Sequence, residues 1–198
     1  MIQIEFGKTE IVLHYSFFLV LFLFIILDKA GFATGFLIAS IVHELGHLIA
    51  MKSYQVRVRS ISLSLLGIHI KSREEKIIGV SSEVMILMAG AFVNSIFAAI
   101  FGFVPCQFFM KLSACNLLLA VFQLIPLNGL DGGSILRIWS SQIFGLQKGY
   151  IIAKVVSFLF CGFIVAMAIL YMNFGNGQRI PLVLIVFAIV AMLSSCLE

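Results

Sequence analysis

The sequence predicts an all-α polytopic membrane protein of about six transmembrane helices, with a small β-hairpin or sheet between the second helix and the third. Two observations support this fold class. Hydrophobic residues make up 62% of the chain, charged residues only 11%, and the mean hydropathy is +1.15. In addition, the apolar residues fall into long runs separated by short polar segments. This composition excludes a soluble globular domain, and we expect residues 1–198 to form a single membrane-embedded domain.

Six apolar runs are about as long as a helix must be to cross the hydrocarbon core of a bilayer. They comprise residues 11–27, 32–51, 80–104, 105–125, 150–172 and 180–197. The one sizeable polar segment, residues 52–79, instead alternates polar with apolar residues. The alternation covers residues 56–65, is broken by Gly67 and resumes at residues 68–71, which predicts a pair of strands at the membrane surface. His69 belongs to this alternation and is expected to be a strand residue.

The second apolar run carries two histidines four residues apart, His43 and His47, with Glu44 directly after the first. On a helix this spacing puts both imidazoles on one face, where they can grip a single metal ion. Glu44 can then reach a water on that metal as general base. The alternative is a pair of buried structural histidines, but it leaves Glu44 as a lone carboxylate in hydrocarbon, with no basic residue between Lys29 and Lys52. Because such groups are costly in lipid, we favour a catalytic metal site.

The fourth run ends in a segment that cannot continue a regular helix. Residues 126–133 hold one proline and three glycines, so the chain must turn there. Asp131 is therefore expected on a constrained loop at the end of a span. It is the preferred third metal ligand, because the only other aspartate, Asp28, is expected on the far side of the membrane.

The distribution of basic residues predicts the orientation. In a six-span arrangement ten Lys and Arg residues collect on one side, which are Lys8, Lys52, Arg57, Arg59, Lys71, Arg73, Lys76, Arg137, Lys148 and Lys154. The other side has three, Lys29, Lys111 and Arg179. Positively charged loops stay in the cytosol, so both termini are expected there in a multi-pass protein of the cell membrane. The second and fourth spans then both run inward, so the two histidines and Asp131 are expected at the same cytosolic end.

These residues predict hydrolysis of a peptide bond. Two histidines and one carboxylate leave a fourth tetrahedral position for water, which is typical of a catalytic zinc site. Zinc lowers the pKa of that water and polarises a nearby carbonyl, and Glu44 would pass the water's proton to the leaving amine. A helical substrate must unwind first, and the polar strand pair and the loop of residues 126–133 are candidate places to hold it extended.

The residues resemble the site-2 protease family of intramembrane zinc metalloproteases over most of the chain. His43-Glu44-Leu45-Gly46-His47 is similar to the family's H-E-x-x-H, which implies zinc ligation by both histidines and a base at Glu44. Leu130-Asp131-Gly132-Gly133, preceded by Ile125-Pro126, resembles the second motif, which implies Asp131 as third ligand of one Zn2+ per chain. Ala89-Gly90-x-x-x-Asn94 resembles a family segment between them, with Ala91 where a proline is usual.

The chain departs from the family pattern outside the ligands. Gln123 stands where the second motif usually begins with an asparagine that is thought to help position substrate, and Asn128-Gly129 replaces a commonly proline-containing pair. Asn94 has two interpretations, an interhelical hydrogen-bonding residue and a residue that shapes the site. We count it with Gln123 and Pro126 as the expected substrate-binding residues.

The lack of a PDZ insertion points to the compact branch of the family that includes stage IV sporulation protein FB. Those relatives often carry a C-terminal CBS domain, which is not expected here, so the resemblance supports a protease more strongly than it supports a role in sporulation. That resemblance implies a membrane-tethered protein substrate, with a sigma-factor precursor in sporulation as one candidate, and membrane regulatory partners. The lipid bilayer is a further partner, and nucleic acid is not expected. Two alternatives remain: a membrane metal transporter that uses the same His and Asp site, and an inactive relative, against which the intact ligands and base count.

Overall fold

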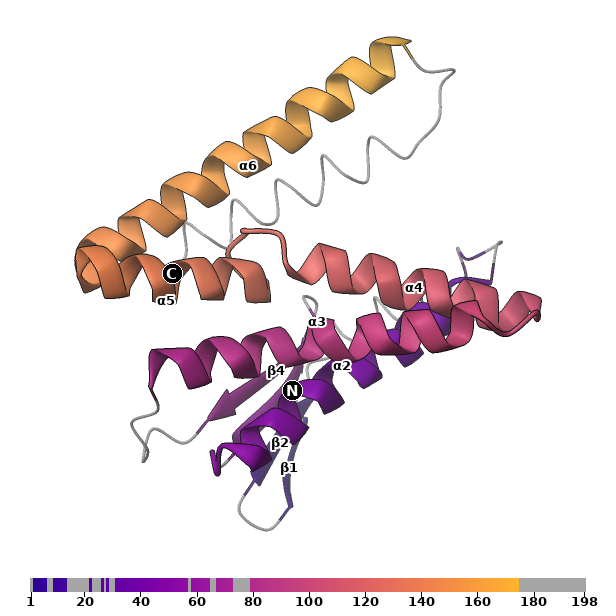
Figure 1. The fold of residues 1–198 in the computed structure, drawn as a ribbon, viewed down its shortest axis with the longest axis horizontal. Helices are drawn as coiled ribbons and strands as arrows, with labels where there is room; N and C mark the ends of the chain where they lie inside the picture. The colour runs from indigo at the N-terminus through magenta and orange to yellow at the C-terminus, as the bar shows by residue number, and fades with distance from the viewer. Residues whose placement is uncertain are drawn as a thin grey trace. The chain divides into compact units, whose positions relative to one another are not determined.

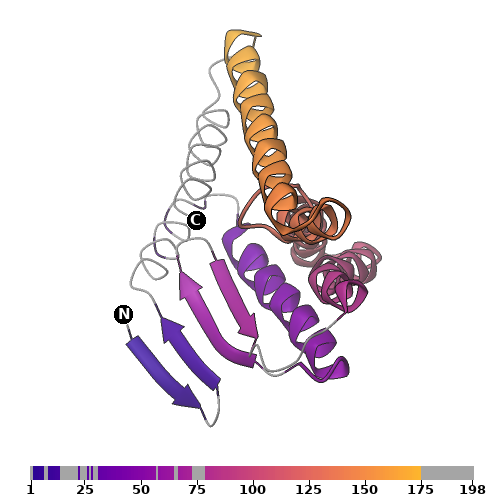
Figure 2. The ribbon, with the colours of Figure 1, turned by 90° about the vertical axis from the view of Figure 1, so that its left-hand side faces the viewer.

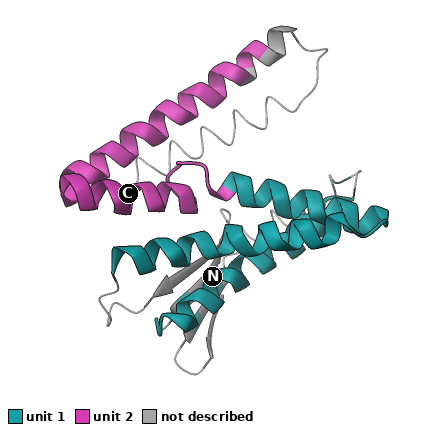
Figure 3. Ribbon diagram, viewed as in Figure 1, with its two compact units in different colours: residues 1–122 teal, residues 123–198 magenta. Residues whose placement is uncertain are grey.

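The computed structural model describes residues 2–6, 9–13, 22, 26, 28, 31–56, 58–64, 67–72 and 79–174. These residues form a four-stranded sheet and the helices labelled α2 to α6 (Figure 1). The chain divides into two compact units, Met1–Phe122 and Gln123–Glu198, and each is described by itself (Figure 3). The expectation of one domain stays a prediction.

Three of the described helices are long and apolar enough to cross a membrane. They are α2 (Ala33–Ser53), α3 (Val80–Gly102) and the part Leu146–Met167 of α6 (Leu146–Phe174). Helix α4 (Gln107–Gln123) is apolar but has only 17 residues. The mainly helical structure is thus confirmed, with three helices that could cross a membrane, whereas the number of six spans is not established. Most of the first predicted span and the whole of the sixth, residues 180–197, lie outside the described residues.

The sheet is larger than the predicted strand pair. Its strands are β1 (Ile2–Phe6), β2 (Thr9–Leu13), β3 (Val58–Ser64) and β4 (Gly67–Ser72), in the order β1-β2-β3-β4. β2 pairs in parallel with β3, and the β1–β2 and β3–β4 pairs are antiparallel. The predicted start of the first span at residue 11 is therefore wrong, because residues 11–13 pair with residues 61–63. Short aliphatic runs suit strand and helix alike, and only the pairing partner decides.

β3 and β4 pair where the sequence predicts two strands, and His69 lies in β4 opposite Ser62. The connection at residues 65–66 lies outside the described part, so the hairpin itself stays a prediction. β4 contacts α2, and Figure 2 shows the two side by side. The sheet is thereby attached to the helix that carries the two histidines.

Helices α2 and α3 run antiparallel with their backbones in contact. A Cβ added to Gly46 would lie 2.8 Å from the carbonyl oxygen of Ala89 and 3.0 Å from the Cα of Gly90. Real Cβ atoms do not approach backbone so closely, so a side chain at Gly46 would push the helices apart. Small residues therefore permit the close approach of these two helices.

Helix α4 joins this pair through contacts at its middle. The hydroxyl of Ser113 donates to the carbonyl oxygen of Ala98 at 2.6 Å, which links α4 to α3. On α2, a Cβ added to Gly35 would lie 2.8 Å from the Sγ of Cys115. Three helices of the first unit therefore pack closely around small residues.

In the second unit, α5 (Asp131–Phe144) packs against α6. The expectation that Asp131 lies on a loop is wrong, because Asp131 is the first residue of this helix. Proline and glycines end α4 as predicted, but Leu130 is extended, and the helix restarts directly after it. An acidic residue in the first turn interacts favourably with the helix dipole. Gly132 and Gly133 permit the restart, because their Cα atoms pack against carbonyl oxygens of Leu124 and Leu127.

A serine on α6 holds the loop that leads to Asp131. The hydroxyl of Ser157 donates to the carbonyl oxygen of Pro126 at 3.1 Å and accepts from the N–H of Asn128 at 3.1 Å. Between these two residues, Leu127 is fully buried and packs with Cys161 of α6. The loop is thus fixed to α6 on both sides of a buried leucine.

We expect Ser157→Ala to destabilise the second unit by about 1–2 kcal/mol, because it leaves a buried amide and a carbonyl without their partner. Hydrogen exchange of the Asn128 amide should accelerate in the variant, measured by mass spectrometry in detergent. Ser95→Ala is the matched control, since the Ser95 hydroxyl donates only to Ala91 of its own helix. Equal exchange at Asn128 in wild type and Ser157→Ala would show that the serine does not hold the loop.

Candidate metal centre

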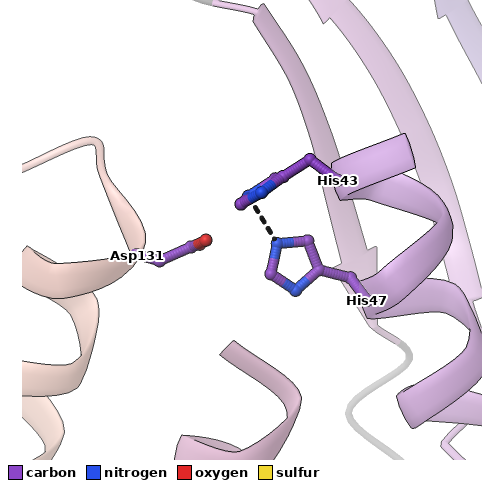
Figure 4. A group of neighbouring side chains, drawn as sticks. All are labelled: His43, His47 and Asp131. Atoms are coloured by element: carbon purple, nitrogen blue, oxygen red, sulfur yellow. Dashed lines mark hydrogen bonds between the residues drawn. The ribbon is translucent and has the colours of Figure 1, made fainter. Parts of the chain in front are cut away.

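The two histidines of the predicted motif lie one turn apart on α2 and face each other. Their Nε2 atoms are 3.0 Å apart, and the rings stand nearly perpendicular, at 84° (Figure 4). His43 is 1% exposed and His47 8% exposed, although both lie in an otherwise apolar helix. The helical spacing that the sequence provides therefore brings two ring nitrogens to one buried point.

The backbone of α3 fixes the orientation of His47. Its Nδ1 lies 2.8 Å from the carbonyl oxygen of Ile86. A carbonyl can only accept, so Nδ1 must carry the proton and donate it. In the neutral ring the lone pair is then on Nε2, the atom that faces His43. Metal-binding histidines commonly donate the N–H that does not face the metal to a carbonyl in this way, and the hydrogen bond fixes the tautomer of the ring.

Gly90 of α3 lies directly against both rings. A Cβ at this position would be 2.6 Å from the Nε2 of His47 and 2.7 Å from the Nε2 of His43. Only a glycine leaves these nitrogens where they are. The helix contact at Gly46 and Gly90 therefore shapes the space around the histidine pair.

The histidine pair fits a zinc ion. Two nitrogens bonded to one tetrahedral zinc at about 2.0–2.1 Å lie about 3.3 Å apart. The observed separation of 3.0 Å is close to this value, and at least the lone pair of His47 already faces inward. Zinc binding would need only a small rotation of the two rings.

Two further residues of the predicted site have defined places in their own units. Glu44 follows His43 on α2 and is half-buried. Asp131 opens α5 in the second unit and is also half-buried (Figure 4). The imidazole nitrogens on α2 and the carboxylate oxygen on α5 are donor types that zinc binds.

Comparison with known proteins finds two similar proteins. No family model matches the chain. A zinc metalloprotease of Methanocaldococcus jannaschii is 33% identical over 127 residues, which cover 59% of this chain and 36% of that protein. The solved structure of a site-2 protease from the same organism matches with a TM-score of 0.71 and 25% identity, and the match covers 100% of this chain and 94% of that one. The chain is thus similar in sequence to a zinc metalloprotease and in fold and sequence to a site-2 protease.

These matches support the site-2 protease family as a whole and do not single out the branch of stage IV sporulation protein FB, which stays a prediction. The chain spans little more than a third of the length of the metalloprotease relative. Three described helices of this chain are long and apolar enough to cross a membrane. This finding agrees with the similarity to a site-2 protease.

The three predicted substrate-binding residues lie in different places. Asn94 is fully buried on α3, one turn after Gly90. Gln123 ends α4, and Pro126 lies in the loop held by Ser157. Their contact with substrate stays a prediction.

Sequence reasoning missed two supporting groups. The Ile86 carbonyl has no sequence signal, because every residue carries one. Ser157 is a single hydroxyl residue in an apolar run. From the sequence, a serine that bonds to another segment cannot be told apart from a serine that bonds to its own helix. Both act only through contacts between distant segments.

Proposed function

We propose that this protein is an intramembrane zinc metalloprotease that hydrolyses a peptide bond in or near a transmembrane segment of a membrane-tethered protein. The observation that carries the proposal is the buried histidine pair, with Nε2 atoms 3.0 Å apart and His47 held by Ile86. Asp131 supplies the third ligand of one zinc ion per chain. The donor set of the three residues supports this assignment.

Each residue has a chemical role in the proposed reaction. His43, His47 and Asp131 hold zinc, which when bound supplies a Lewis acid that lowers the pKa of water and polarises a carbonyl. Glu44 accepts the proton of the attacking water and gives it to the leaving amine. Its place beside His43, half-buried on the same helix, supports this role.

The substrate is a membrane-tethered protein whose segment unwinds before cleavage, because the hydrogen bonds of a helix shield its peptide bonds. The sheet and the loop of residues 124–130 are the proposed places that hold it extended, with Gln123, Pro126 and Asn94 near it. The excess of Lys and Arg in the segments listed above supports a cytosolic active site and cytosolic termini. A sigma-factor precursor in sporulation is one candidate substrate, and membrane regulatory proteins are proposed as further partners of the protease.

Reconstituted protein distinguishes this function from metal transport. In liposomes with a tethered model substrate, we expect a shortened product that disappears with a zinc chelator and returns when zinc is added back. Asp131→Ala should lose both the product and most of the bound zinc, because two histidines alone bind zinc weakly. Zinc flux into the liposomes should not exceed that of empty liposomes.

Each result has a clear meaning. Product formation that resists the chelator would contradict the metalloprotease, as would full zinc content in Asp131→Ala. Zinc flux without cleavage would favour the transporter, for which Glu44 beside the first histidine has no use.

A further inference from the structure

Two fully buried asparagines stand out in the first unit. Asn94 of α3 and Asn116 of α4 are both 0% exposed. Among the residues that the structure describes, neither the Nδ2 nor the Oδ1 of Asn94 has a hydrogen-bond partner, and the Oδ1 of Asn116 has none either. The Nδ2 of Asn116 donates to the carbonyl oxygen of Leu112 at 2.8 Å. Three strong hydrogen-bonding atoms are thus buried among apolar helices without protein partners.

Contacts between α3 and α4 put the two asparagines at the same level. Ser113 of α4 donates to the carbonyl of Ala98 on α3. The helices are consecutive and antiparallel, as Figure 1 shows. Asn94 lies one turn before Ala98 on α3, and Asn116 lies one turn after Ser113 on α4. Because the two helices are antiparallel, both steps lead in the same direction away from the Ser113–Ala98 hydrogen bond.

Contacts of α2 place this level next to the histidine pair. Gly35 of α2 faces Cys115, and His43 faces Gly90. Ala39 lies midway between Gly35 and His43 on α2 and is 0% exposed. On α3, Asn94 lies one turn from Gly90. The carboxamide of Asn94 is therefore about one helical turn, roughly 5 Å, from the histidines, and that of Asn116 lies on the side of Gly35, up to about two turns from His43.

We propose that Asn94 and Asn116 form an internal water-binding site between α2, α3 and α4. A buried polar atom without a partner costs about 1–3 kcal/mol, so three such atoms require a ligand. The atoms offer two acceptors and one donor, a set that matches water, and buried waters typically make about three hydrogen bonds to such groups.

The site explains how an apolar helix bundle keeps water beside the histidine pair. Cleavage of each peptide bond consumes one water, and hydrocarbon supplies none. A store one turn away would replace the consumed molecule without a detour through lipid. This use of the water rests on the proposed function, whereas the water site itself does not.

The chain contains its own reporters for buried water. Cys115 is adjacent to Asn116 and is 0% exposed, while Cys161 on α6 is 2% exposed and packs against Leu127. Cys106 is exposed. Short X-ray pulses generate hydroxyl radicals from any nearby water, and cysteine is among the side chains that they oxidise fastest. Mass spectrometry of the zinc-loaded protein in detergent then measures oxidation at all three cysteines.

We expect Cys115 to be oxidised at least about threefold more than Cys161, with Cys106 as the exposed reference. Asn116→Leu removes the hydrogen-bonding groups and should lower oxidation of Cys115 to the level of Cys161. Asn116→Ser keeps a hydroxyl and should retain most of it. Equal protection of Cys115 and Cys161 in the wild type would overturn the water site, even if the leucine variant failed to fold.

Cleavage assays test the use of the water separately. Asn116→Leu should lower kcat at unchanged zinc content and similar KM. If Cys115 is labelled in the wild type but the leucine variant cleaves at the normal rate, the supply role is overturned and the water site stands. Loss of cleavage in every variant, wild type included, would instead contradict the proposed protease.

Discussion

Replacing Glu44 with glutamine should lower the cleavage rate by a factor of about 10²–10⁴, the usual contribution of a general base. Glutamine keeps the size of the side chain but cannot accept a proton from water. Zinc content should stay at one ion per chain, because Glu44 is not among the donors His43, His47 and Asp131. Product formation from a tethered substrate, together with elemental analysis of zinc, measures both effects.

Glu83→Gln is the matched control for this substitution. Glu83 is exposed in the first turn of α3, so its loss removes a carboxylate of equal size away from the histidines. It should leave cleavage within about twofold of wild type. Unchanged cleavage in Glu44→Gln would rule out its role as the base, while loss of zinc in that variant would make it a ligand instead.

The histidine pair could be predicted from the sequence because its geometry is local. Residues four apart share a face of any helix, so recognising a helix at residues 43–47 is enough to bring both imidazoles together. The same holds for the end of α4, because Pro126 cannot continue a regular helix whatever the surroundings. Local stereochemistry decides both features.

Asp131 shows where local reasoning is insufficient. Gly132 and Gly133 predict a turn by propensity, yet they lie in the first turn of α5. Their lack of side chains is used for packing against carbonyls of Leu124 and Leu127, and not for a loop conformation. Tertiary contact overrides helix propensity here, and the sequence does not reveal the contact.

The N-terminal strands were missed for a related reason. Residues 11–13 are aliphatic and precede a long apolar run, so hydropathy extends the span over them. Their partner is β3, almost 50 residues later in the chain. Pairing over such a separation leaves no mark on the local pattern.

Gly90→Ala should lower zinc affinity by about 10–100-fold or more while the protein still folds. The new Cβ would lie 2.6 Å from the Nε2 of His47 and 2.7 Å from the Nε2 of His43. These atoms are at the ends of side chains that can rotate, so the fold can adjust by turning the rings. The adjustment moves both lone pairs away from the shared point, and zinc binding is lost with little change in the melting temperature.

Two other glycines separate this effect from simple loss of stability. Gly162→Ala on α6 has nothing within 4 Å of its new Cβ, so zinc affinity and melting temperature should match or slightly exceed wild type. Gly46→Ala meets backbone of α3 instead of side chains, so its main effect should be a lower melting temperature. We therefore expect mainly a lower zinc affinity in Gly90→Ala and mainly a lower melting temperature in Gly46→Ala. Chelator competition measures the affinity, and intrinsic fluorescence measures the melting temperature. Wild-type zinc affinity in Gly90→Ala would show that the rings do not need this glycine, and the centre would then depend on α2 alone.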